Sequence, residues 1–330
     1  MSDLLISAKE LSVHFPLRGF VFGERPVVRA CQGINLDIEK GSFVGLVGES
    51  GSGKTTLGRA MLKAAPISEG SITFTDTDVT YDLATLQGPE LKDYRKRAQL
   101  IFQDPYAALS PRMTVRDIIA EPLEVMKITS SREETDAKVR EIAALCRLNL
   151  EHLRRFPHAF SGGQRQRISI ARALVSDPHF IVADESVAAL DVSIQADVLN
   201  LLRSIQEENG ITFLFISHDL SVIAHTCDFV AVMYLGNIVE AAPTRKLFSE
   251  TAHPYTKALL SAIPSLDPDD QHKAEKLEGE IPSPINPPPG CRFHTRCRFA
   301  QDRCKAEVPE WKEMSSGHHV ACHFAKELLA

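Results

Sequence analysis

The order of hydrophobic and polar positions predicts strands of two kinds. Two segments alternate between apolar and polar residues, as half-buried strands do: 4–15 and 34–38. Three short runs are almost wholly apolar, which is typical of strands covered on both faces in a parallel sheet: 43–47, 180–183 and 212–216. The last two runs end in polar residues, and ligands bind at the carboxyl ends of such strands. We therefore expect an α/β fold with a ligand site at that edge.

The segments between and after these strands have different sequence patterns. Residues 16–29 are typical of a loop, and residues 113–175 are rich in Glu, Lys, Arg, Leu and Ala at helical spacing. Prolines crowd residues 282–289, as in a stiff linker. The predicted division is a main domain over 1–260, a helical subdomain within it at about 110–175, and a C-terminal region over 261–330.

Composition excludes several classes of protein. With 44% hydrophobic and 24% charged residues the chain can bury a core, so it is not a disordered protein. A net charge of −6 disfavours a general nucleic-acid binder. Apolar runs are too short for a membrane helix, and the N-terminus lacks the pattern of a secretory signal. We expect a soluble, cytoplasmic protein.

The seven cysteines fall into two groups. Cys31, Cys146 and Cys227 are scattered among apolar neighbours and are most simply core residues. The other four crowd the C-terminal region: Cys291, Cys297, Cys304 and Cys322. In a reducing compartment such a group indicates a metal site rather than disulfides.

The segment GESGSGKT fits the pattern G-x-x-x-x-G-K-[ST] of a loop that cradles phosphates. Backbone N–H groups must turn toward the phosphate oxygens, which favours residues without a Cβ. The next helix is predicted to begin at Lys54, so its positive end faces the phosphates. Lys54 would reach the β- and γ-phosphates of ATP, and Thr55 would hold Mg²⁺. The predicted nucleotide-binding residues are Gly48, Glu49, Ser50, Gly51, Ser52, Gly53, Lys54, Thr55 and Thr56.

Two carboxylates follow the apolar run 180–183. Asp184 can bind Mg²⁺, usually through water, and Glu185 is placed to polarise the attacking water. Many strands end in two carboxylates, so the pair alone is weak evidence for a catalytic site. It becomes strong evidence because the phosphate cradle is present in the same chain. Together they predict an ATPase with Glu185 as a catalytic residue.

The string FSGGQRQR at 160–167 distinguishes among proteins with this cradle. It resembles the signature motif of ABC ATPases, normally LSGGQ, and its glycine pair opens a predicted helix, 164–174. The resemblance implies an ABC-type core: a RecA-like sheet plus a helical subdomain. It also implies that two ATPase domains dimerise head to tail, each signature closing over the other's cradle. The signature residues that would contact nucleotide are Ser161, Gly162, Gly163 and Gln164.

Other marks of the ABC family stand in order. Gln103 matches the Q-loop, which implies both a catalytic and a Mg²⁺-binding role. Residues 188–191 match the D-loop, and His218 matches the catalytic switch histidine. Phe15 is the candidate for stacking on adenine, with a core aromatic as the alternative.

Two positions depart from the family pattern. Ser186 stands where the family has Pro, and Ala188 stands where the D-loop begins with Ser. The lost hydroxyl at Ala188 could have contacted the partner's cradle. It suggests that the two composite sites of a dimer differ.

The C-terminal region indicates which subfamily of ABC ATPases the chain resembles. Residues 253–260 (HPYTKALL) and 279–284 (GEIPSP), followed by the cysteines, resemble oligopeptide/dipeptide importer ATPases. The resemblance implies a second, similar ATPase, two membrane permease subunits, a substrate-binding protein, and a place on the cytoplasmic face of the inner membrane. The same family also imports nickel, opines and oligosaccharides.

The four cysteines are spaced C-x5-C-x6-C-x17-C. Structural zinc usually needs closer pairs, and wide spacing suits a larger cluster. The resemblance points to a [4Fe–4S] cluster, with zinc or free thiols as alternatives. Nearby arginines would offset an anionic cluster or form a solvated basic face: Arg292, Arg296, Arg298 and Arg303. We expect the cradle to lie in a separate part of the fold from these cysteines.

Two other functions compete with an importer motor. A soluble ABC ATPase acting on DNA or ribosomes is disfavoured, since the gap from cradle to signature is too short for long coiled coils and there is one ATPase core. A regulatory subunit that senses nucleotide or a cluster need not keep Glu185. The importer motor is the preferred hypothesis.

Overall fold

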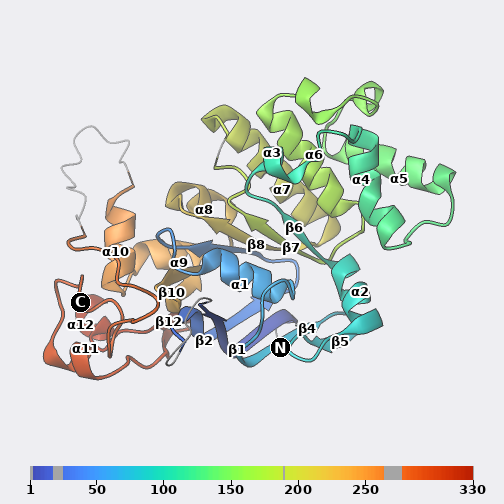
Figure 1. Cartoon of the computed structure of the whole chain (residues 1–330). Helices are drawn as coiled ribbons and strands as arrows, with labels where there is room; N and C mark the ends of the chain where they lie inside the picture. The colour runs from blue at the N-terminus through green and yellow to red at the C-terminus, as the bar shows by residue number, and fades with distance from the viewer. Residues whose placement is uncertain (1–2, 18–24, 189, 264–276, 330) are drawn as a thin grey trace. The chain divides into compact units, whose positions relative to one another are not determined.

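The computed structural model describes residues 3–17, 25–188, 190–263 and 277–329, and the chain divides into two compact units (Figure 1). Unit 1 comprises residues 1–3, 39–43 and 85–216. Unit 2 comprises residues 4–38, 44–84 and 217–330. Each unit is described by itself.

Three parallel strands form the sheet of unit 1. β7 (Phe180–Asp184) lies between β6 (Ala98–Ile101) and β8 (Thr212–Ser217). Every residue of β7 and β8 is buried, which confirms the prediction of two buried strands here. The long helix α7 (Val192–Asn209) ends at Gly210, whose φ of 66° is the left-handed conformation that glycine adopts readily.

The predicted helical insertion is present in unit 1. Its main helices are α4 (Val115–Val125), α5 (Arg132–Leu145) and α6 (Gly162–Leu174), and α4 packs against both of the others. Shorter helices of the unit are α2 (Gly88–Arg97), α3 (Pro105–Ala108), η1 (Leu150–His152) and η2 (Pro157–Ala159). Helices α4, α5 and α6 lie within the segment 113–175.

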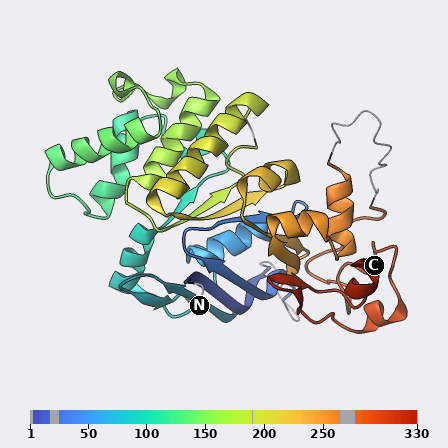
Figure 2. The same ribbon diagram turned by 180° about the vertical axis from the view of Figure 1, so that it is seen from behind.

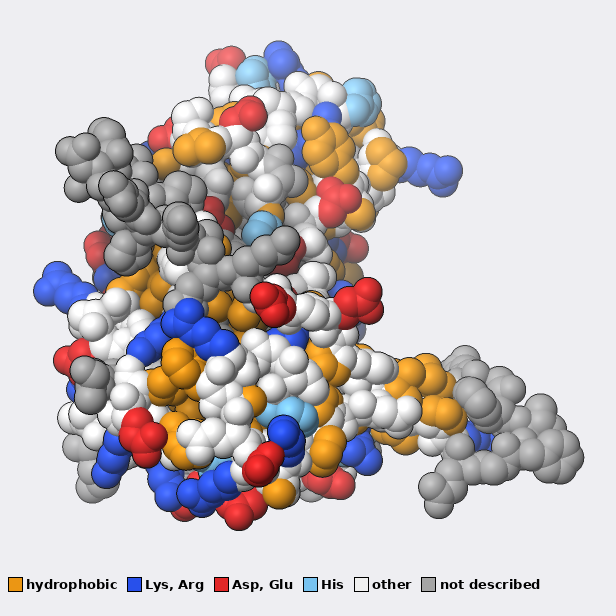
Figure 3. Space-filling view, turned by 90° about the vertical axis from the view of Figure 1, so that its left-hand side faces the viewer, with side chains coloured by type: hydrophobic (Ala, Val, Ile, Leu, Met, Phe, Trp, Pro, Cys, Tyr) orange, Lys and Arg blue, Asp and Glu red, His pale blue; other side chains and the backbone are white. Residues whose placement is uncertain are grey.

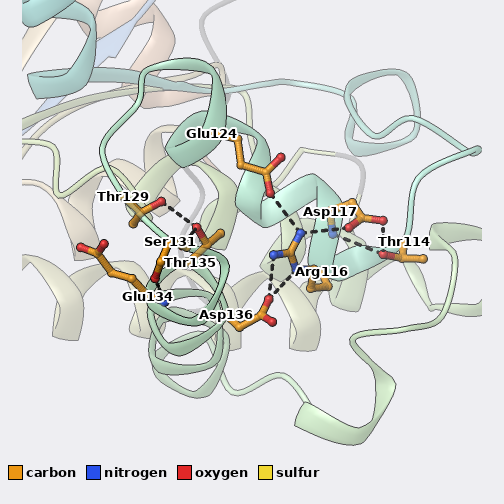
Figure 4. Close-up of polar contacts among 9 residues, drawn as sticks. All are labelled: Thr114, Arg116, Asp117, Glu124, Thr129, Ser131, Glu134, Thr135 and Asp136. Atoms are coloured by element: carbon orange, nitrogen blue, oxygen red, sulfur yellow. Dashed lines mark hydrogen bonds and ion pairs between the residues drawn. The ribbon is translucent and has the colours of Figure 1, made fainter.

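A single arginine ties α4 to α5 (Figure 4). The Arg116 guanidinium contacts Asp136 of α5 at 2.7 Å, and also Asp117 at 3.2 Å and Glu124 at 3.1 Å. Thr114 caps α4 by accepting a hydrogen bond from the Asp117 amide. An isolated surface ion pair contributes little, but one guanidinium shared among three carboxylates fixes the geometry of two helices.

Unit 2 contains an antiparallel sheet in the order β2-β1-β4-β5. Its strands are β1 (Leu4–Pro16), β2 (Val27–Glu39), β4 (Glu69–Thr75) and β5 (Thr80–Asp82). The strands predicted at 4–15 and 34–38 are confirmed. The loop predicted over 16–29 is too long, because β2 begins at Val27; residues 18–24 lie outside the described part of the chain.

A second set of strands in unit 2 carries the phosphate cradle. The buried β3 (Phe43–Val47) pairs in parallel with β9 (Phe229–Tyr234). Antiparallel strands follow: β10 (Asn237–Pro243), β12 (His318–Val320) and β11 (Lys312–Ser315). The remaining helices are α1 (Lys54–Met61), α8 (Leu220–Thr226), α9 (Thr244–Ser249), α10 (Pro254–Ser261), α11 (Asp302–Ala306) and α12 (Ala325–Leu329).

Residues 277–329 pack onto the rest of unit 2, where Figure 2 shows them beside α9 and α10. Glu240 of β10 is wholly buried and accepts hydrogen bonds from the backbone amides of Ala252 and His253 at 2.7 and 3.1 Å. His318 Nε2 of β12 lies 2.9 Å from the same carboxylate. One buried acid thus joins β12 to the start of α10.

The surface mixes charges of both signs. On the face seen in Figure 3, the described residues include both Lys and Arg side chains and Asp and Glu side chains. In the part of the chain that the structure describes, no helix is long and apolar enough to cross a bilayer.

Candidate functional site

The predicted cradle is a loop that only glycine permits at two positions. A Cβ on Gly48 (φ 151°) would lie 2.1 Å from the Met233 carbonyl oxygen. A Cβ on Gly53 (φ 106°) would lie 2.2 Å from the Ala30 carbonyl oxygen. The loop joins β3 directly to α1, which begins at Lys54 as predicted. The positive end of α1 therefore faces the loop, as an anion-binding site requires.

Lys54 is held inside the cradle. Its side chain is buried, and Nζ donates hydrogen bonds to the carbonyl oxygens of Gly48 at 2.7 Å and Glu49 at 3.0 Å. Its ammonium charge is thus fixed at the mouth of the loop, where it can compensate phosphate charge.

The structure brings Gln103 and Glu185 together in unit 1. Gln103 Nε2 donates a hydrogen bond to Glu185 Oε2 at 2.6 Å. Glu185 directly follows β7 and has a φ of 44°, an uncommon conformation for a residue with a side chain. Its backbone N–H donates to the Ile216 carbonyl of β8 at 3.0 Å, which fixes the turn. Asp184 is buried at the end of β7.

The signature residues form the start of α6. Ser161 and Gln164 make a reciprocal capping box, in which Ser161 Oγ accepts from the Gln164 amide and Gln164 Oε1 accepts from the Ser161 amide. A Cβ on Gly163 would lie 2.4 Å from Cγ2 of Ile194 in α7, so the second glycine permits close helix packing. The N-terminus of α6 is thereby preorganised to face an anion.

The remaining predicted residues occupy exposed positions. His218 follows β8 and is exposed, and Phe15 near the end of β1 is 38% exposed. An exposed aromatic is free to stack, whereas the alternative of a core aromatic requires burial. Ala188 is also exposed, and Ala189 lies outside the described residues. The cradle, Phe15 and His218 belong to unit 2; Gln103, Asp184, Glu185 and the signature belong to unit 1.

The four C-terminal cysteines belong to unit 2, and none of the seven cysteines forms a disulfide. Burial raises the pKa of Cys291 to about 12, and its three tail partners contribute to the same shift. Burial likewise raises the pKa of Cys322 to about 11 and that of Cys297 above its ordinary value. Among the described residues, no group of three or more His, Cys, Asp or Glu side chains could hold a metal ion. Cys31, Cys146 and Cys227 are buried, as predicted for core residues.

The expectation that the cradle is separate from the cysteine segment is wrong. Arg296, beside Cys297, makes two hydrogen bonds to the carboxylate of Glu49 in the cradle, at 2.6 and 3.1 Å. Arg292 donates hydrogen bonds to the Leu235 carbonyl and to Gln32 Oε1. These two arginines bind the ATPase core and are not a solvated basic face. The sequence did carry a signal: an acidic residue in a loop built for anions calls for a cationic partner.

Comparisons with known proteins identify the family of the chain. The model of the ABC transporter family matches residues 31–188, and that of the oligopeptide/dipeptide transporter C-terminal region matches residues 239–304. Oligopeptide transport ATP-binding protein AppF of Bacillus subtilis is 46% identical over 326 residues, covering 97% of each chain. A protein of Brucella ovis that carries the name of a peptide import ATP-binding protein is 48% identical over 318 residues, covering 96% of this chain and 97% of its own.

The chain belongs to the ATP-binding subunits of ABC transporters, in the oligopeptide/dipeptide family. Solved cassettes share its fold. The ATP-binding cassette MJ0796, in a dimeric post-hydrolysis state with ADP and phosphate, is 27% identical with a TM-score of 0.63 and covers 73% of this chain and 99% of its own. CbiO1 of Clostridium perfringens is 25% identical with the same TM-score, covering 75% and 92%. This ABC subunit is an ATPase of the predicted α/β fold.

Proposed function

We propose that this ABC ATPase drives an importer of di- or oligopeptides through two membrane permease subunits, at the cytoplasmic face of the membrane. The observation that carries the proposal is similarity over nearly the whole chain, including the C-terminal region, to proteins named for peptide transport. Importers of nickel, opines or oligosaccharides are the alternatives, because the ATPase has no contact with the cargo.

Transport in reconstituted vesicles tests the proposal. The ATPase, its cognate second ATPase, the two permeases and the binding protein are assembled in liposomes, and uptake of a labelled peptide is measured with and without ATP. ATP-dependent peptide uptake is expected, and Lys54→Ala should abolish it. Uptake of nickel or an oligosaccharide without uptake of peptide would refute the peptide assignment and identify the alternative cargo.

The residues of the two units have distinct proposed roles in ATP hydrolysis. Lys54 neutralises phosphate charge, and Glu185 orients and polarises the attacking water. The Gln103–Glu185 hydrogen bond supports this role, because it fixes the carboxylate that would accept the water proton. His218 would contact the γ-phosphate, and Phe15 would stack on adenine.

Mg²⁺ is the metal that the site would hold with ATP. The proposed ligands are the Thr55 hydroxyl, the Asp184 carboxylate and the Gln103 amide oxygen, and oxygen donors of this kind suit Mg²⁺. The ion would neutralise part of the phosphate charge.

The complete site is proposed to need a second ATPase. The capped N-terminus of α6 is a second anion-facing helix end, and a head-to-tail partner would bring its own copy over this cradle. A heterodimer is favoured because Ser186 and Ala188 depart from the family pattern, which suggests two unequal sites. The purified chain alone should then be a weak ATPase that the partner stimulates.

A groove in unit 1 is the proposed seat of a permease segment. Its volume is about 280 Å³, and its apolar lining includes Leu100, Phe102, Pro122, Val125 and Met126. Phe102 and Val125 are 42% and 73% exposed, which favours an apolar occupant. Phe102 directly precedes Gln103, so an occupant of the groove would press on the residue that holds Glu185.

The four C-terminal cysteines are proposed to hold a [4Fe–4S] cluster. The free thiols lie together, and backbone amides of Phe293, Phe299 and Phe324 donate hydrogen bonds to three of them, in each case from two residues further along the chain. Such N–H donors stabilise thiolate ligands, which supports the proposal. The cluster would supply a covalent tie that orders the segment.

Metal analysis after anaerobic reconstitution tests the cluster. We expect brown protein with absorption near ~400 nm and about four irons per chain. Cys297→Ser should lose most of this colour, whereas Cys146→Ser, at a buried cysteine outside the group, should keep it. Stoichiometric zinc without iron would show a zinc site in place of the proposed cluster. The absence of bound metal would refute both the cluster and the zinc site.

A further inference from the structure

Glu49, the second residue of the phosphate cradle, is paired with an arginine of the cysteine-rich segment. Arg296 Nη1 lies 2.6 Å from Glu49 Oε2 and Nη2 lies 3.1 Å from Oε1, so the contact is bidentate. The Arg296 side chain is only 5% exposed and that of Glu49 27%. The guanidinium is therefore largely removed from water, and its charge acts on the carboxylate with little screening.

The backbone of Glu49 is held from the same direction. Its N–H donates a hydrogen bond to the Tyr255 hydroxyl of α10 at 2.8 Å. The Tyr255 ring packs on Tyr234 and Phe293, with ring centroids 4.7 and 5.4 Å away. The guanidinium of Arg296 lies 5.9 Å from the centre of the Tyr234 ring. Side chain and amide of one cradle residue are thus both fixed by the C-terminal part of unit 2.

The contacts that fix Glu49 also affect Lys54, the residue proposed to contact phosphate. Lys54 Nζ donates to the carbonyl oxygen of Glu49 at 3.0 Å, so the position of Glu49 sets the position of the ammonium. The charges matter as well. A Glu49 carboxylate without its arginine would repel the ATP phosphates and compete with them for Lys54.

We propose that Arg296 is a positioning residue of the phosphate cradle: it neutralises Glu49 and fixes the loop so that Lys54 is available to ATP. The inference rests on nucleotide binding by this ATPase and not on the cargo. Through Arg296, the cysteine-rich segment would then contribute to nucleotide binding.

The test measures ATP affinity by calorimetry on the full chain, with a non-hydrolysable ATP analogue. Arg296→Gln should weaken binding about tenfold, because it leaves a negative charge in the cradle. Glu49→Gln should raise the affinity, because it removes that negative charge from the cradle. The double variant should recover most of the affinity that Arg296→Gln loses.

Arg303→Gln is the matched control. Arg303 directly precedes Cys304 as Arg296 precedes Cys297, but it is exposed and pairs only with Glu307 among the described residues. The same charge is removed, and affinity should stay within about twofold of the wild type. Thermal unfolding of every variant shows that the chain remains folded.

The opposite effects of the two single variants separate this role from a structural one. If Arg296 only supported the fold, both halves of the pair would weaken binding, and the double variant would not recover it. Either that result, or an unchanged affinity in folded Arg296→Gln, would overturn the proposal. Failure to transport peptides would leave these affinities unaffected, so the two proposals fail separately.

Discussion

Replacing Glu185 by Gln removes one charge and one proton acceptor from the candidate catalytic site and little else. Gln103 Nε2 donates to Glu185 Oε2 at 2.6 Å, and the new amide oxygen can accept the same hydrogen bond. The two side chains have nearly equal volume. Both pay the same cost of about 1 kcal/mol for the left-handed backbone at φ 44°, so the fold should be unaffected.

The expected loss is in turnover alone. A positioned general base contributes about 10²–10⁴ in rate, which corresponds to about 3–5 kcal/mol of transition-state stabilisation. ATP affinity should not fall, since the cradle and Lys54 are unchanged. The variant should therefore bind ATP, hold the closed dimer and hydrolyse hundreds to thousands of times more slowly, on the order of that range.

Phosphate release by the assembled transporter measures turnover, and calorimetry measures ATP affinity. Glu207→Gln is the matched control, because Glu207 lies in the same unit on the exposed end of α7 and pairs with Arg203 on the surface. It should hydrolyse at the wild-type rate. Turnover of Glu185→Gln within tenfold of the wild type would refute the assignment of Glu185.

Three further changes have distinct expected outcomes. Gly163→Ala places a Cβ 2.4 Å from Ile194 and should cost about 1–3 kcal/mol of stability by thermal unfolding, whereas Gly162→Ala meets nothing closer than 3.7 Å and should cost less than 1. Burial lowers the pKa of His253 from 6.5 to about 4, so its stability contribution is complete above pH 6.5 and is lost as the pH falls toward 4. His253→Asn should remove about 3 kcal/mol of that acid sensitivity in denaturant titrations, while the new amide still caps α10. Phe293→Ala empties a ring cluster at a site 2% exposed and should cost about 3–5 kcal/mol; limited proteolysis should then cut the C-terminal segment first. An unaltered melting temperature for Gly163→Ala, an unchanged pH slope for His253→Asn, or full protease resistance for Phe293→Ala would contradict these expectations.

The sequence by itself determined the elements whose physics is local. Glycines at 48 and 53 are required by close backbone approach, and a helix starting at Lys54 follows from the motif. The strand predicted at 180–183 follows from an apolar run, which is stable in a sheet covered on both faces, and the structure has it at 180–184. Ser161 and Gln164 cap α6 across three residues, so their contact is encoded in their spacing.

Only the tertiary structure decided which distant residues meet. Glu49 and Arg296 are 247 residues apart, and no periodicity links positions at such a separation. Gln103 and Glu185 meet because β6 and β7 lie in parallel register, which neither strand specifies alone. The same holds for the cradle and the cysteine segment. Composition predicted that they lie in separate parts of the fold, whereas the structure packs them against each other. Local conformation follows from backbone sterics within a few residues, whereas a long-range ion pair exists only once the whole core has placed both partners.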